Sequence, residues 1–163
     1  MTGKKEIERE FIHMIHQYEK VIYKVCSFYT SDEYPLADLY QDIVYNLWKS
    51  YPGFRGESSE STWIYRIALN TCISGLRKIK NKPDKISLSG FEVHFIEPEN
   101  MEENIREMYS LIRRLGTLER AIVLLYLEEK SYREIADVTG LSLSNVAAKL
   151  KRIKLKLKKM SEQ

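Results

Sequence analysis

A segment near the carboxyl end carries hydroxyl, amide and cationic side chains at spacings suited to contact with a polyanion. Ser131 and Glu134 have the spacing of a capping box. Gly140 suits the turn between two helices, and Ser142 can cap the helix that follows. This layout predicts a helix-turn-helix. The exposed side of its second helix would offer five residues to a DNA major groove: Ser144, Asn145, Ala148, Lys149 and Arg152.

The alternative for this segment is a helical hairpin with no ligand. The cap, the glycine and the basic continuation together favour DNA binding. The tail from Ile153 to Leu157 alternates as a strand does, but an apolar stripe at helical spacing runs unbroken through it. We therefore predict a helix whose buried side consists of Val146, Leu150, Ile153 and Leu157.

A second segment whose side chains could bind a ligand runs from Phe54 to Asn70, where a glycine and serine loop leads into an amphipathic helix. Thr62 is predicted to cap this helix, which would begin at Trp63. One sector of the helix is apolar and carries Ile64, Ile67 and Ala68. Another sector offers hydrogen-bonding and cationic groups to a ligand: Thr62, Arg66, Asn70 and Arg77.

Enzymatic chemistry finds little support in the sequence. His13 and His16 have a spacing that can chelate a metal, but no Cys, Asp or Glu is placed to complete the site, which favours surface histidines. No nucleophile is paired with a base, and Gly56 stands alone instead of forming a phosphate-binding loop. We expect no catalytic residue, no metal and no cofactor.

The composition predicts a globular, cytoplasmic protein. The chain has 163 residues, of which 44% are hydrophobic, and a net charge of +3. Cations are concentrated from Lys149 to Lys159, whereas the stretch from Glu92 to Glu107 is acidic. Cys26 and Cys72 are the only cysteines, and neither a signal peptide nor a membrane-spanning run is apparent, so we expect a reduced setting without membrane insertion.

Helical periodicity defines the elements that would position these side chains. One helix is predicted from Glu6 to Phe28, and a second begins with Pro35 in its first turn and ends near Tyr51. The apolar stripe of the second helix comprises Leu39, Ile43, Val44, Leu47 and Trp48. Its other face carries Asp38, Gln41 and Asp42.

Regular structure is predicted to stop at Asn81 and to resume near Met101. Residues 81–100 read as a linker, within which Phe91, Val93 and Phe95 alternate with polar residues as in a short strand. Beyond it, Thr117 is predicted to cap a strongly apolar helix over residues 121–127. The predicted fold is all-α, with two small helical domains over residues 1–80 and 101–163 joined by that linker.

Three segments in order resemble the extracytoplasmic-function (ECF) branch of bacterial RNA polymerase sigma factors. The helix from Asp38 to Trp48 is similar to the polymerase-binding helix of that family. Phe54–Ser58 with Thr62–Asn70 resembles its promoter-melting segment, and Ser131–Arg152 resembles its promoter helix-turn-helix. Glu60, Gly116 and Ala147 depart from the family pattern: an aromatic, Leu-Pro and Lys are frequent at these three places.

The resemblance implies a transcription initiation factor that binds core RNA polymerase and promoter DNA. Three residues would face the clamp helices of the largest subunit: Asp38, Gln41 and Asp42. The loop from Phe54 to Ser61 would receive a flipped base beside Asn70, and the minus-ten set would be Phe54, Arg55, Gly56, Glu57, Ser58, Thr62, Trp63, Arg66 and Asn70.

The second domain would contact the flap of the second-largest subunit and read the minus-thirty-five element. The residues implied are Arg133, Ser144, Asn145, Ala148, Lys149, Lys151 and Arg152, with Ser144 and Asn145 as base readers and the last three on phosphates. An anti-sigma factor is a further partner compatible with this family. The competing hypothesis is a helix-turn-helix regulator that acts without polymerase; it would need a dimer interface or an effector domain in place of the melting segment.

Overall fold

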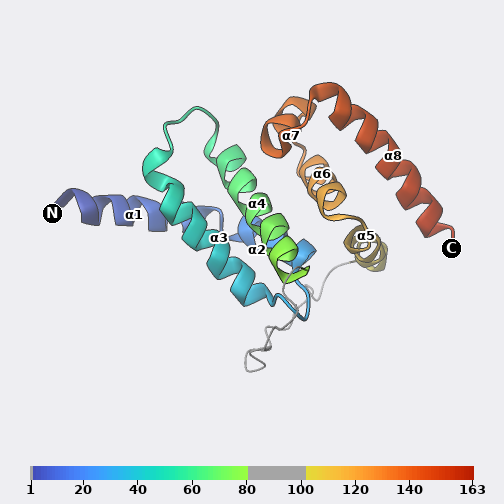
Figure 1. Ribbon diagram of the computed structural model, residues 1–163, viewed down its shortest axis with the longest axis horizontal. Helices are drawn as coiled ribbons and strands as arrows, with labels where there is room; N and C mark the ends of the chain where they lie inside the picture. Colours follow the sequence, from blue (N-terminus) through green and yellow to red (C-terminus); the bar gives the residue numbers. More distant parts are fainter. Residues whose placement is uncertain (1, 81–101) are drawn as a thin grey trace. The chain divides into compact units, whose positions relative to one another are not determined.

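The computed structural model describes residues 2–80 and 102–163 (Figure 1). Over these two ranges the chain forms α-helices, one short 3-10 helix and no strand. Contacts between residues divide the chain into two compact units, the first formed by α1–α4 and the second by α5–α8. The predicted all-α class, with two helical domains and a helix-turn-helix in the second, is confirmed.

Three predictions lie wholly or partly outside the described residues. These are the linker over residues 81–100, the alternative strand at Phe91–Phe95 and the start of a helix at Met101. The side chain of Arg77, predicted on the polar side of its helix, also lies outside them.

The first unit contains α1 (Thr2–Gln17), α2 (Glu19–Tyr29), α3 (Leu36–Ser50), the 3-10 helix η1 (Tyr51–Gly53) and α4 (Glu60–Lys80). Helices α2, α3 and α4 pack against one another (Figure 1). Their apolar stripes meet in a core of fully buried side chains, because each helix turns one aliphatic or aromatic face inward. This core includes Ile22, Val25, Phe28, Leu39, Ile43, Leu47, Ile64 and Ala68.

The single helix predicted from Glu6 to Phe28 is two helices that break at Tyr18. The backbone of Tyr18 has φ −106° and ψ 15°, outside the helical region. Hydrogen bonds continue across the break, from the Tyr18 amide to the Met14 carbonyl and from the Ile22 amide to the Tyr18 carbonyl, both 3.0 Å. Because the apolar spacing also continues, hydrophobic periodicity gives no sign of the break.

The start of α4 differs from the prediction that Thr62 caps a helix beginning at Trp63. The helix begins at Glu60, and the hydroxyl of Ser59 accepts a hydrogen bond from the Thr62 amide at 3.1 Å. Thr62 is only 5% exposed, because it lies one turn inside the helix on its buried side. Ser59 therefore caps the helix, and Thr62 does not belong to the exposed polar face.

Helix α3 begins at Leu36, with Pro35 immediately before it instead of inside the first turn. The predicted stripe is largely correct, since Leu39, Ile43 and Leu47 are fully buried. Trp48, by contrast, keeps 36% of its surface exposed.

The second unit contains α5 (Glu103–Arg113), α6 (Thr117–Leu127), α7 (Tyr132–Thr139) and α8 (Leu143–Ser161). Helix α6 is its central element, with five consecutive buried residues from Ala121 to Leu125. The prediction that Thr117 caps α6 is wrong: the cap position is Gly116, whose amide donates to Glu119 Oε1 at 3.1 Å.

Both caps predicted for the helix-turn-helix are confirmed. The Ser131 hydroxyl accepts from the Glu134 amide at 3.1 Å, and Glu134 Oε1 accepts from the Ser131 amide at 3.2 Å. Gly140 ends α7 with φ 78°, a left-handed conformation that favours glycine. Ser142 caps α8, which continues as a helix through the segment that alternates like a strand.

Candidate nucleic-acid interface

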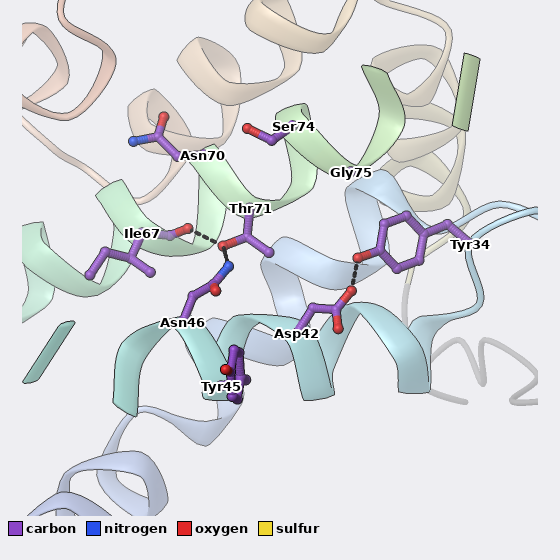
Figure 2. A pocket seen from close by; sticks show the side chains of 9 residues that line it. All are labelled: Tyr34, Asp42, Tyr45, Asn46, Ile67, Asn70, Thr71, Ser74 and Gly75. Carbon is purple, nitrogen blue, oxygen red and sulfur yellow. Dashed lines mark hydrogen bonds between the residues drawn. The ribbon is translucent and has the colours of Figure 1, made fainter. Parts of the chain in front are cut away.

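A polar groove lies between α3 and α4 (Figure 2). Its volume is about 510 Å³, and both helices contribute side chains that can hydrogen-bond to a ligand. The lining residues are Tyr34, Asp42, Tyr45, Asn46, Ile67, Asn70, Thr71, Ser74 and Gly75. The groove thus combines the exposed face of α3 with the polar face of α4.

Hydrogen bonds hold the two walls of the groove together. The Asn46 side-chain amide on α3 donates to Thr71 Oγ1 on α4 at 2.9 Å, and that hydroxyl donates to the Ile67 carbonyl at 2.7 Å. In Figure 2 these bonds form a continuous chain, and no dashed line reaches the side-chain amide of Asn70. The exposed Asn70 amide can therefore donate to and accept from a base edge.

Tyr34 closes the other end of the groove. Its hydroxyl donates to a carboxylate oxygen of Asp42 (Figure 2). Burial raises the pKa of Tyr34, and the hydrogen bond to Asp42 raises it further, so the phenol stays protonated as a donor. Asp42, predicted to face polymerase, is thereby placed in the same groove as Asn70, predicted to face DNA.

Gly75 allows the close approach of Tyr34. A Cβ built on Gly75 would overlap the Tyr34 ring, so a larger residue would force the ring to move. Sequence reasoning missed Tyr34, Asn46, Thr71 and Gly75 as part of this site. The one available signal was a glycine inside a strongly helical pattern, which often marks a close packing contact.

The loop that precedes α4 is supported by aromatic rings. The Phe54 and Trp63 rings lie 4.8 Å apart between centroids, and Trp63 lies 6.2 Å from Tyr51. Trp63 is only 7% exposed, so its ring packs against Phe54 of the loop instead of facing solvent. Gly56 at the loop tip has φ 73°.

The other predicted minus-ten residues differ in exposure. Arg55, Gly56 and Glu57 are exposed, whereas Phe54, Ser58 and Arg66 are half-buried.

Residues Asp38 and Gln41 lie exposed on α3, as the predicted polymerase contact requires. Gln41 also lines a second groove, of about 450 Å³, together with apolar side chains of α1 and α3. Ile12 and Tyr45 within it are 54% and 62% exposed. The remaining lining residues are Glu8, Phe11, Val44 and Trp48.

Helix α8 presents most of the predicted minus-thirty-five residues on one side. Ser144, Asn145, Ala148, Lys151 and Arg152 are exposed, Lys149 is half-buried, and Arg133 is exposed on α7. The buried side of α8 carries Val146, Leu150 and Ile153, which packs it against the rest of the unit. Five of the predicted contact residues, Ser144, Asn145, Ala148, Lys151 and Arg152, therefore lie on the accessible side of α8.

Two lysines further along α8 contact other side chains of the second unit. Lys154 Nζ donates to the Tyr126 hydroxyl at 3.1 Å and lies 4.3 Å from the centroid of that ring. Lys156 Nζ lies 3.1 Å from Glu119 Oε1. Lys151 and Arg152, nearer the beginning of α8, are exposed.

His13 and His16 find no metal-binding partners in the structure. His16 Nδ1 lies 3.7 Å from Glu19 Oε2, and both side chains are largely exposed. Across residues 2–80 and 102–163, no three His, Cys, Asp or Glu side chains gather into a group that could hold a metal. No helix within these ranges combines the length and apolarity that crossing a membrane requires.

Comparison with known families matches both units. The Sigma-70 region 2 family matches residues 14–82, and the Sigma-70, region 4 family matches residues 105–157. Among solved structures, the sigma factor RpoE in complex with the anti-sigma factor NepR from Bartonella quintana has a TM-score of 0.72 at 16% identity, over 97% of this chain and 98% of that chain. At this identity the likeness establishes the fold.

Curated relatives carry the same family name. The ECF RNA polymerase sigma factor SigG of Mycobacterium tuberculosis is 30% identical over 86% of this chain, which spans only 45% of its length. RNA polymerase sigma factor YlaC of Bacillus subtilis is 33% identical, with 75% of each chain covered. The ECF RNA polymerase sigma-E factor of Escherichia coli is 29% identical over 89% of this chain and 83% of that protein. The chain therefore belongs to the ECF family of RNA polymerase sigma factors.

Proposed function

We propose that this chain is a transcription initiation factor that binds core RNA polymerase, recognises promoter DNA with both units and helps to melt it. The observation that carries the proposal is the open Asn70 amide at a polar groove between α3 and α4, on the helix into which the 54–59 loop leads. An amide that donates and accepts can read the edge of an unpaired base. The chain would act by binding and not by catalysis.

The energetics of melting are compatible with this role. Extruding a base costs a few kcal/mol, and stacking in a protein site returns about 1 to 3 kcal/mol per base. The exposed loop tip and Asn70 would hold the base, while Phe54 and Trp63 keep the loop in place. Binding to polymerase would supply the remaining free energy.

For the polymerase contact, we assign Asp38 and Gln41 together with the apolar groove that Gln41 lines. Its exposed Ile12 and Tyr45 are the kind of surface that another protein covers, because single exposed apolar residues are common but a lined groove is not. Asp42 is the weaker candidate, since its carboxylate already accepts from Tyr34. An anti-sigma factor that competes for the same face is a further proposed partner, supported by the fold shared with RpoE in its complex with NepR.

For duplex recognition, we assign base contacts to Ser144 and Asn145 and phosphate contacts to Lys149, Lys151 and Arg152. The Ser142 cap supports this assignment because it fixes the first turn of α8, in which both base readers lie.

The test is transcription by core polymerase from a library of promoter sequences, with and without the chain. We expect the chain to direct transcripts from a specific subset of promoters. Tight binding to duplex DNA without any specific transcript would contradict the proposal and favour a regulator that acts without polymerase. If the folded chain neither bound duplex DNA nor directed any specific transcript, the proposed DNA recognition would be contradicted as well.

A further inference from the structure

We propose that Lys154 and Lys156 are positioning residues that hold α8 at a fixed angle to α6, so that the first turn of α8 meets the edges of the bases. Neither lysine would contact DNA itself. The inference rests on the proposed function, because it concerns the helix assigned to duplex recognition. It deepens that assignment by giving a role to the second half of α8.

The two lysines bind opposite ends of α6. Lys156 Nζ donates to Glu119 Oε1 at 3.1 Å, in the first turn of α6. That carboxylate oxygen also accepts from the Gly116 amide at 3.1 Å, so it is itself held at the start of the helix. Lys154 Nζ donates to the Tyr126 hydroxyl at 3.1 Å, in the last turn, and lies 4.3 Å from the centroid of that ring.

The two lysines also project from opposite flanks of α8, because residues two apart on a helix are separated by about 200° around its axis. The buried side of α8 lies between these flanks, with Leu150 and Ile153 each 1% exposed. Apolar packing alone fits a range of crossing angles, with a scatter of about 15 to 20° among helix pairs. One polar contact on each flank opposes rotation in both senses.

The crossing angle matters because the base readers lie far from these contacts. Ser144 and Asn145 precede Lys154 by ten and nine residues, which is about 14 Å along an α-helix. A rotation of about 15° at the contacts would move the first turn of α8 by about 4 Å. A displacement of that size breaks a hydrogen bond to a base edge.

A direct role of the two lysines in phosphate binding makes the opposite prediction. In that case Tyr126 and Glu119 would hold the cations away from DNA, and removal of either partner would strengthen binding to any duplex by freeing a positive charge. If the partners instead fix the angle of α8, their removal weakens binding to the recognised sequence and leaves other duplexes unaffected. Tyr126 and Glu119 are not among the assigned DNA contacts, so the direction of the change separates the two roles.

The experiment measures the affinity of the full chain, bound to core polymerase, for two duplexes. One carries the upstream element of a promoter that the chain transcribes in the library test, and the other has the same bases in shuffled order. We expect Tyr126→Phe, Glu119→Gln and Lys156→Met each to lower affinity for the first duplex alone, by about two- to fivefold, as for the loss of one exposed polar contact. The double variant Tyr126→Phe/Glu119→Gln should lose more than either single variant.

Glu107→Gln is the matched control for Glu119→Gln, because it removes the same charge at an exposed position within α5. It should leave both affinities unchanged. Stronger binding of both duplexes by Tyr126→Phe would overturn the inference in favour of cations held back from DNA. An equal loss on both duplexes for Lys156→Met would overturn it in favour of a phosphate contact, and unchanged affinities for all the variants would overturn it too.

Residual dipolar couplings of the backbone amides, measured on the chain without DNA, separate this inference from the proposed function. They report the direction of α8 relative to α6. We expect this direction to change in the double variant Tyr126→Phe/Glu119→Gln and to be kept in Glu107→Gln. If the unaltered chain directs no specific transcript but the direction changes, the proposed function fails and the positioning role stands. An unchanged direction in the double variant would overturn the inference whatever the result of transcription.

Discussion

The side-chain amide of Asn46 on α3 donates to the hydroxyl of Thr71 on α4 at 2.9 Å, immediately beside Asn70. This bond fixes the separation of the two walls of the polar groove. Thr71 is only 8% exposed, so its hydroxyl would be poorly hydrated without this partner.

Thr71→Val is expected to lower the free energy of unfolding of the first unit by about 1 kcal/mol, because it leaves the Asn46 amide without its partner. The chain has two tryptophans, Trp48 and Trp63, and both lie in the first unit, so tryptophan fluorescence during urea unfolding reports on that unit. The matched control is Thr117→Val, in the first turn of α6 of the second unit. A larger effect of the control on the same fluorescence transition would contradict the prediction.

Asn70→Ala and Gln41→Ala are expected to separate DNA opening from polymerase affinity. Asn70→Ala should reduce promoter opening by about tenfold, as for a lost pair of hydrogen bonds to a base, and leave affinity for core polymerase unchanged. Gln41→Ala should do the reverse, since its side chain lines the apolar groove on the other side of α3. Asp42→Ala is unsuited to this comparison, because it would also leave the Tyr34 hydroxyl without its acceptor.

Affinity measured with labelled core polymerase, alongside opening measured by 2-aminopurine, gives both quantities for each variant. If Asn70→Ala and Gln41→Ala both lost only polymerase affinity, the assigned roles would be wrong.

Gly75→Ala is expected to destabilise the first unit by about 1 to 3 kcal/mol, because the new methyl group would displace the Tyr34 ring. Alanine has the higher helix propensity by about 1 kcal/mol, so the measured cost is what remains after that gain. Gly53→Ala is the control: nothing lies within 4 Å of a Cβ at that position. The fluorescence-detected urea midpoint should fall for Gly75→Ala alone, and equal midpoints for both variants would show that the ring moves without cost.

The second unit is expected to lose stability as the pH falls below about 4.5. Hydrogen bonds from Ser131 lower the pKa of Glu134 from its ordinary value of 4.5. Burial alone would raise the pKa of Glu119, but the Gly116 amide and Lys156 outweigh it and the pKa is lowered. Carboxyl groups with a lowered pKa in the folded state stabilise it fully above their unfolded pKa, and that stability is lost as pH falls through the folded pKa.

Amide hydrogen exchange of α6, α7 and α8 at several pH values measures this loss. Glu134→Gln keeps an acceptor for the Ser131 amide and removes one titrating group, so the dependence on pH should become shallower. Glu107→Gln, at an exposed position within α5, should leave the profile as it is. An unchanged profile for Glu134→Gln would contradict the assigned cause.

Helix existence was predictable from the sequence, because apolar residues such as Leu39, Ile43 and Leu47 recur at a spacing that packing then buries. The position of the α4 cap was not, since Ser59 and Thr62 are both suitable capping residues. Burial of Thr62 against the core decides between them, and burial depends on the tertiary structure. The break at Tyr18 was hidden because the apolar spacing continues across it.

Only part of the lining of the polar groove could be predicted from the sequence. Asn70 was found because an amide on a polar helical face is conspicuous, whereas Tyr34 and Asn46 enter the site only through the packing of α3 on α4. That packing also places Asp42 in the same groove as Asn70, which is predicted to face DNA. The assignment of individual residues to polymerase, minus-ten and minus-thirty-five contacts remains a prediction.

The internal contacts of Lys154 and Lys156 bear on how strongly salt should weaken duplex binding. A protein that neutralises phosphates releases condensed counterions, and the slope of log affinity against log salt concentration counts those phosphates. Cations already held by Tyr126 and Glu119 add little to that count. If Lys149, Lys151 and Arg152 make the proposed phosphate contacts, the slope should be smaller than the total basic charge of α8 would suggest.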